Sequence, residues 1–97
     1  MNENQKDIQY NRLQTLQNLN NGSVVEGLAD KLTALILSGE LPEGFVFPNE
    51  NDFCNFLGIG RSTLRETYKV LESNGMIERS RKGTVVNNFD VIIASFL

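Results

Sequence analysis

Apolar residues first recur at helical spacing between residues 24 and 38. Ser23 and Glu26 have the spacing of a capping box, in which each side chain bonds the backbone amide of the other residue. Gly39 supplies the stop, because glycine enters the left-handed conformation without steric cost. The pattern predicts a first helix over 24–38, with an apolar stripe made of Val24, Leu28, Leu32, Leu35 and Ile36.

A second, shorter helix is predicted over 50–57, with Asn49 as its N-cap. Only residues 58–60 separate it from a third helix predicted over 61–73. Such a tight link between two helices is the pattern of a helix-turn-helix. The residues expected to be buried are Phe53, Phe56 and Leu57 on the second helix and Leu64, Thr67, Tyr68 and Leu71 on the third.

The remaining pattern favours extended structure. Residues 45–47 form a short extended piece within a loop that contains both prolines. Residues 76–77 and 85–86 are β-prone and flank a turn at residues 81–83, which predicts a two-stranded hairpin. The expected fold class is therefore mainly α with a small β-hairpin (α+β). It is a winged helix-turn-helix over residues 23–88, with three helices plus a two-stranded wing.

The two ends differ from this domain. Residues 1–22 are rich in Asn and Gln and have only a partial helical rhythm. They are interpreted as a flexible or weakly helical extension, and the alternative is a helix that packs on the domain or on a partner chain. Residues 89–97 form an apolar tail without a terminator. We expect the tail to be the start of a C-terminal element that continues beyond these residues, and the alternative is an element that packs on a partner.

Charge is distributed unevenly along the 97 residues, whose formal net charge is -3. Residues 1–60 hold three basic and eight acidic side chains, a balance of -5, whereas residues 61–97 hold six basic and four acidic ones, a balance of +2. All six of these cations lie between Arg61 and Lys82. A local basic footprint of this kind is what contact with phosphates requires.

Other side chains limit the chemistry available. The chain has no histidine, which removes the commonest general base and the commonest metal ligand. Cys54 is the only cysteine, and its apolar surroundings favour a buried thiol over a reactive one. We therefore expect no enzyme, no metal and no cofactor. No apolar run approaches the ~20 residues of a membrane span, and a cytoplasmic location is expected.

Arg61, Arg65 and Lys69 are four residues apart and form one slanted stripe on the third helix. Arginine offers a planar fork that suits guanine O6 and N7 in the major groove. Ser62 and Thr63, in the first helical turn, can bind phosphate oxygens together with the free backbone amides. The alternative is an ordinary solvated face, in which Glu66 and Glu72, each three residues from Lys69, pair with that lysine.

The hairpin favours DNA contact over an ordinary solvated face. Arg79, Arg81 and Lys82 form a second cationic point directly after the helix-turn-helix, and Gly83 allows close approach of backbone to a groove or phosphate. The predicted DNA-binding residues are accordingly Arg61, Ser62, Thr63, Arg65, Lys69, Arg81, Lys82 and Gly83.

The run from Gly39 to Val86 resembles the DNA-binding domain of the GntR family of bacterial transcription regulators. The family pattern is approximately G-x-L-x-P-G, L-P-S-E-R, L-G-V-S-R-x-T-V-R-E-A, L-E-x-x-G-L-I and a glycine-bearing wing. The matching stretches here are GELPEG, PNE, LGIGRSTLRE, LESNGMI and KGTVV.

The resemblance implies that Arg61 and Arg65 are the principal groove and phosphate contacts, and that Lys82 and Gly83 approach the minor groove. The continuation of the wing, VNNF, is most similar to the FadR-like branch, whose members join this domain to an all-helical ligand-binding domain. An effector ligand would then bind a domain that these residues do not contain.

Three positions depart from the family pattern. Asn51 stands where the family has arginine, so one backbone contact is expected to be lost. Gly60 replaces the usual Ser or Thr at the N-cap of the third helix, and Glu43 stands where proline is typical.

The leading hypothesis is sequence-specific binding of double-stranded DNA by a homodimer on an inverted repeat, as the operator-reading part of a transcription regulator. The alternative hypothesis is a winged-helix module that binds another protein through the same outward face. An enzyme is the least favoured class, since no histidine is present to activate the cysteine.

Overall fold

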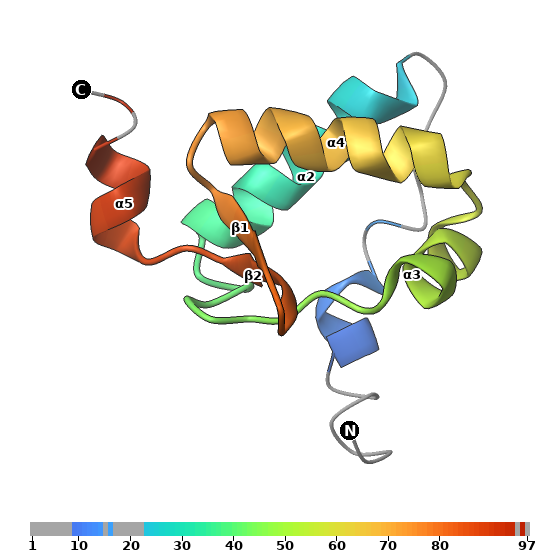
Figure 1. The fold of residues 1–97 in the computed structure, drawn as a ribbon, viewed down its shortest axis with the longest axis horizontal. Coiled ribbons are helices and arrows are strands. Elements are labelled where there is room, and N and C mark those ends of the chain that lie inside the picture. Colours follow the sequence, from blue (N-terminus) through green and yellow to red (C-terminus); the bar gives the residue numbers. More distant parts are fainter. Residues whose placement is uncertain (1–8, 15, 17–22, 95, 97) are drawn as a thin grey trace.

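The computed structural model describes residues 9–14, 16, 23–94 and 96. The elements in chain order are α2 (Val24–Leu37), α3 (Glu50–Leu57), α4 (Arg61–Ser73), β1 (Ile77–Ser80), β2 (Gly83–Val86) and α5 (Phe89–Ala94). In Figure 1, α4 lies across α2, the two-stranded wing lies beside them, and α5 extends to one side. The predicted winged helix-turn-helix fold, mostly helical with one two-stranded antiparallel sheet, is confirmed.

Local capping explains where the helices begin and end. The Ser23 hydroxyl accepts a hydrogen bond from the Glu26 amide, and the Asn49 side chain accepts one from the Asp52 amide. Gly58 ends α3 in the left-handed conformation with φ 70°. Each of these groups satisfies a backbone group that a helix end would otherwise leave unpaired. The three predicted helices are confirmed to within one residue at each boundary.

One side of α4 supplies the centre of the core. Its buried residues are the four that the sequence predicted, Leu64, Thr67, Tyr68 and Leu71. They pack where α4 contacts α2, α3 and β1. On α2, the prediction was wrong for Val24, which is exposed because it lies in the first turn, while Ala29 is buried in the interior of the helix.

The wing is longer than the sequence predicted. Its antiparallel register pairs Ile77 with Val86 and Ser80 with Gly83. Gly83 is therefore the first residue of β2 and not part of the turn, which is made by residues 81 and 82. The predicted extended piece at residues 45–47 is confirmed, since Val46 forms a β-bridge with Val85 on the free edge of β2.

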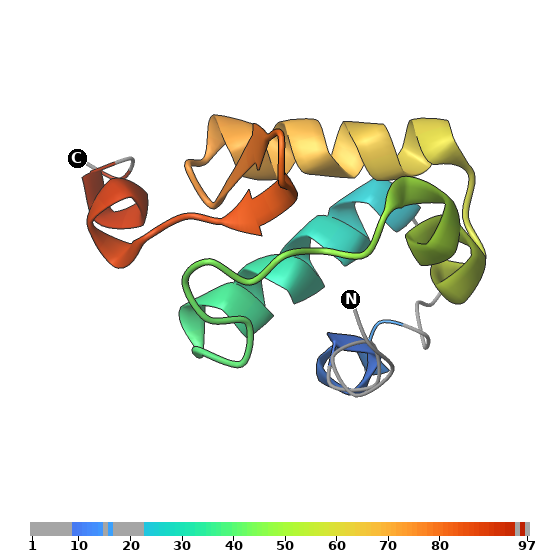
Figure 2. The same ribbon diagram turned by 60° about the horizontal axis from the view of Figure 1, so that its bottom comes forward.

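Both ends of the described chain contact the domain. Leu13 and Leu16 are fully buried in the core, and the Tyr10 ring lies 4.8 Å from that of Phe56. Figure 2 shows this segment beneath α2 and α3. Its described residues therefore pack on the domain, as in the second interpretation of residues 1–22. In α5, Ile92 is buried against the core while Phe89 is exposed.

Two glycines give a matched test of the backbone. Gly27 lies inside α2 and Gly58 at the turn between α3 and α4, and an added Cβ meets no atom within 4 Å at either position. We expect Gly27→Ala to raise the free energy of unfolding by about 0.4–1 kcal/mol. Gly58→Ala should lower it by roughly 1–2 kcal/mol, because its φ is positive. Urea unfolding at neutral pH measures both, and effects of the same sign would contradict the assigned backbone.

Candidate nucleic-acid interface

The polar residues of α4 begin directly at its amino-terminal end. Gly60 is the N-cap and makes no side-chain cap hydrogen bond. The first-turn amides of α4 therefore lack a side-chain partner at the N-cap, and such amides are suited to phosphate oxygens. Gly60, which stands where the family pattern has Ser or Thr, thus provides no side-chain cap and leaves these backbone amides without a side-chain partner.

Four of the five predicted residues on α4 are exposed on one surface, and we call Arg61, Ser62, Arg65 and Lys69 the cationic face. The fifth, Thr63, is half-buried, and its carbonyl oxygen accepts a hydrogen bond from the Thr67 hydroxyl at 2.9 Å. Thr63 therefore lies at the edge of this surface, where the helix turns toward the core.

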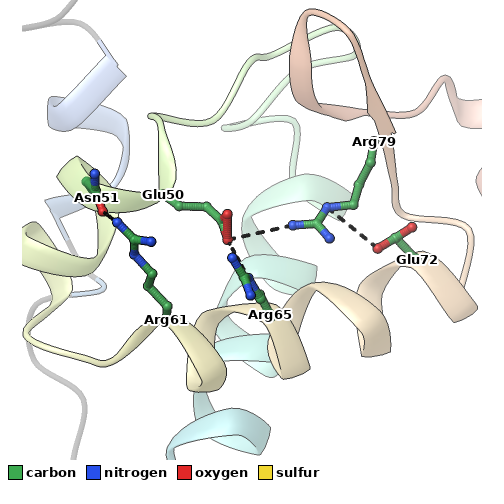
Figure 3. Close-up of polar contacts among 6 residues, drawn as sticks. All are labelled: Glu50, Asn51, Arg61, Arg65, Glu72 and Arg79. Atoms are coloured by element: carbon green, nitrogen blue, oxygen red, sulfur yellow. Dashed lines mark hydrogen bonds and ion pairs between the residues drawn. The ribbon is translucent and has the colours of Figure 1, made fainter.

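The two arginines of the cationic face are each held by a residue of α3. The Arg61 guanidinium donates a hydrogen bond to the side-chain oxygen of Asn51. The Arg65 Nε donates to Glu50 Oε1 at 3.1 Å (Figure 3). Asn51, which stands where the family pattern has a cation, thus orients a neighbouring cation instead.

Arg79 connects the wing to the helix-turn-helix. Its guanidinium lies 3.9 Å from a carboxylate oxygen of Glu50 and 3.9 Å from one of Glu72. It also lies 5.5 Å from the centre of the Tyr68 ring, within the range of a cation–π contact. Figure 3 shows Arg79 reaching from the wing toward both carboxylates. Glu72 therefore pairs with Arg79, whereas the solvated-face interpretation had paired it with Lys69.

The wing tip lies beside the start of α3. Arg81 and Lys82 are exposed at the two-residue turn, which is closed by a hydrogen bond from the Lys82 amide to the Ser80 hydroxyl. A cavity of about 320 Å³ separates this tip from α3 and α4, and Glu50 and Arg79 contribute to its lining. The structure thus brings Arg79, Lys82 and Glu50 to the walls of one cavity.

Neither a metal-binding cluster nor a membrane-spanning helix is present among the described residues. They contain no group of three or more His, Cys, Asp or Glu side chains that could hold a metal ion. Burial, and to a lesser extent the Glu50 carboxylate, raises the pKa of the Cys54 thiol, as expected for a structural cysteine. In the same part of the chain, no helix has the length and apolar character needed to cross a membrane.

Glu50 and Arg79 are the residues that sequence reasoning did not place in the site. The sequence pattern gave Glu50 no role in the site beyond its place in the PNE stretch that matches the family pattern. Arg79 was counted with the wing cations but not among the predicted binding residues. A charged residue at a helix start is the only local signal for Glu50, and it does not indicate which arginines lie opposite.

Comparison with known proteins places this arrangement in a family. The family described as "Bacterial regulatory proteins, gntR family" matches residues 24–86, which include α2, both helices of the helix-turn-helix and the wing.

The chain belongs to the GntR family.

Named relatives agree with this assignment. The HTH-type transcriptional regulator Mce2R of Mycobacterium tuberculosis is 33% identical over 75 residues, which are 76% of this chain and 31% of that protein. The chain thus spans about a third of the length of this relative. The names of such relatives describe transcription regulators, which implies a role other than catalysis.

Solved structures agree with the fold. A transcriptional regulator of the GntR family from Pseudomonas syringae pv. tomato superposes with a TM-score of 0.74 at 22% identity, over 92% of this chain and 40% of that one. YtrA from Sulfolobus acidocaldarius, a GntR-family transcription factor, superposes with a TM-score of 0.63 at 27% identity, over 73% of this chain and 82% of that one.

Tyr68, whose ring lies beneath Arg79, provides a test of how the buried side of α4 is packed. Its hydroxyl is buried and has no hydrogen-bond partner within the described part of the chain. Tyr68→Phe should therefore change the free energy of unfolding at pH 7 by less than about 1 kcal/mol. Urea unfolding measures this difference. A loss of more than about 2 kcal/mol would show that the hydroxyl is bonded.

The same variant tests the ionisation of the phenol. Burial raises the pKa of Tyr68 above its usual 10.0, and this outweighs the opposing effect of Arg79. The neutral phenol therefore contributes stability that is complete below pH 10 and is lost as the pH rises toward the folded-state pKa. Tyr68→Phe should lose less stability than the wild type between pH 9 and pH 11. Tyr10, whose pKa burial also raises, is common to both proteins and cancels in the difference.

Proposed function

We propose that this chain is the operator-reading domain of a transcription regulator and binds a specific sequence of double-stranded DNA. Membership of the GntR family and the names of its relatives support DNA-binding transcription regulation. They do not favour the alternative of a protein-interaction module. The observation that carries the proposal is the cationic face of α4, held beside a basic wing tip on a winged-helix scaffold.

In this proposal the amino-terminal turns of α4 enter the major groove. Arg61 and Arg65 contact base edges and phosphates, while Ser62 and the uncovered first-turn amides bind phosphate oxygens. Lys69 adds a phosphate contact further along the helix. Thr63 has a lesser role than the sequence suggested, because its side chain is half-buried.

The wing completes the contact on the other side of α4. Lys82 and Arg81 approach the backbone or the minor groove, and Gly83 supports the close approach of the turn. Gly83 has φ 114° at the start of β2, a conformation that disfavours any side chain there.

The proposal extends to the assembled regulator. We propose that residues 23–88 form the binding domain, residues 1–22 an extension, and residues 89–97 the lead into a further element. We also propose that the regulator is a cytoplasmic homodimer that binds an inverted repeat. Its architecture would be FadR-like, with an effector domain outside these residues. The similarity of the VNNF stretch to that branch supports its choice.

Selection from a random pool of duplexes at low salt, followed by sequencing, tests the proposed function. Recovery of a short inverted repeat would establish operator reading by a dimer. Recovery of a single half-site would establish reading and assign dimerisation to another part of the regulator. Absence of enrichment, without salt-dependent binding to any duplex, would contradict the proposal.

Two substitutions separate base contacts from phosphate contacts. Arg65→Ala should weaken binding to the selected duplex by roughly 1–3 kcal/mol and relax discrimination at one base position, because a bidentate arginine distinguishes guanine. Lys82→Ala should weaken binding to selected and random duplexes alike and reduce the salt slope by about 1. Titration of both duplexes at several salt concentrations measures these effects. Equal losses on both duplexes for Arg65→Ala would leave it as a phosphate contact.

A further inference from the structure

Glu50 occupies a central position among the cations of the proposed interface. The carboxylate comes from the first residue of α3, and one of its oxygens contacts arginines from two other elements. Arg65 of α4 lies at 3.1 Å and Arg79 of β1 at 3.9 Å from the same oxygen. In Figure 3 the carboxylate lies between the two guanidinium groups.

The contact with Arg65 leaves the rest of that guanidinium group available. The hydrogen bond uses Nε, and within the described residues the structure gives the two terminal nitrogens no hydrogen-bond or ion-pair partner. A guanine edge takes two parallel hydrogen bonds from such a pair of nitrogens. The carboxylate therefore fixes the plane of the Arg65 fork while it leaves the base-reading donors in place.

The same carboxylate opposes contact with phosphates. About a third of the Glu50 side chain is exposed, and Arg65 beside it is exposed to 54%. A duplex of arbitrary sequence offers Arg65 mainly phosphate oxygens, which repel a neighbouring carboxylate and must compete with it for the arginine. Exposed ion pairs contribute little to stability, so orientation and competition are the main consequences of this one.

We propose that Glu50 is a specificity-determining residue of the DNA-binding site, because it orients Arg65 toward base edges and weakens the attachment of Arg65 and Arg79 to phosphates. This inference rests on the proposed function. It assigns a role in DNA recognition to an acidic residue of the otherwise basic interface.

The test compares Glu50→Gln with Glu66→Gln in the 97-residue chain. Both variants remove one negative charge, and Glu66 is an exposed residue of α4 for which the structure gives no ion pair among the described residues. The probes are the duplex that the wild type selects and a scrambled duplex of the same composition, titrated between 50 and 200 mM salt.

We expect Glu50→Gln to lower the ratio of selected to scrambled affinity about tenfold, since an oriented arginine–guanine pair gives discrimination of this order. Scrambled DNA should bind the variant more tightly, with a steeper salt dependence. Glu66→Gln should leave the ratio within about twofold, since a lost surface charge affects both duplexes alike. A merely structural role for Glu50 would weaken both duplexes together and would not raise affinity for scrambled DNA.

A double variant shows whether Glu50 acts on specificity through Arg65. In an Arg65→Ala background, Glu50→Gln should have less than about a twofold further effect on the ratio, because the oriented group is gone. A full tenfold effect in that background would overturn the inference, as would equal ratios for Glu50→Gln and Glu66→Gln. If the wild type itself does not distinguish the two duplexes, the proposed function fails and the inference fails with it. The two failures are thus distinguishable.

Discussion

The burial of one side of α4 is the constraint on which the rest of the structure depends. Leu64, Tyr68 and Leu71 are almost entirely removed from water, and through them α4 packs on α2, α3 and β1. Because residues three and four apart share a helix face, this packing also fixes the direction of the opposite side, where Arg61 and Arg65 lie. A domain of this size has only a modest core. The contacts that hold the fold and those that present the cationic face therefore belong to the same helix.

The ion pairs around Glu50 add a second level of organisation. They join α3, α4 and the wing through Arg65 and Arg79, which lie on separate elements of the fold. Their exposure means that they stabilise the fold only slightly. Their consequence is geometric, since a guanidinium with one fixed nitrogen has fewer orientations to lose on binding. The acidic balance of the rest of the chain has a related effect, because it limits general attraction to polyanions while the local cations remain effective.

Much of the fold could be predicted because its signals are local. The capping residues Ser23, Asn49 and Gly58 determined the helix boundaries, and the periodicity of α4 identified its buried side correctly. The errors arose where tertiary context intervened. Gly83 joined β2 because its pairing with Ser80 extends the ladder by one residue, and Val24 stayed exposed although it fits the apolar stripe of α2. The cations of the candidate site could be predicted from the sequence, but the residues that contact them could not.

The sequence by itself determined the type and order of the elements, the buried side of α4 and the concentration of cations after residue 60. These properties depend on interactions within one or two helical turns, which periodicity and capping residues reveal. Only the tertiary structure decided that Glu50 meets Arg65, 15 residues away, and Arg79 on the wing. Likewise, it placed Asn51 against Arg61 and the wing tip beside α3. Such contacts follow from how α3, α4 and the hairpin pack on a shared core, and no local pattern in the chain encodes which surface charges that packing brings together.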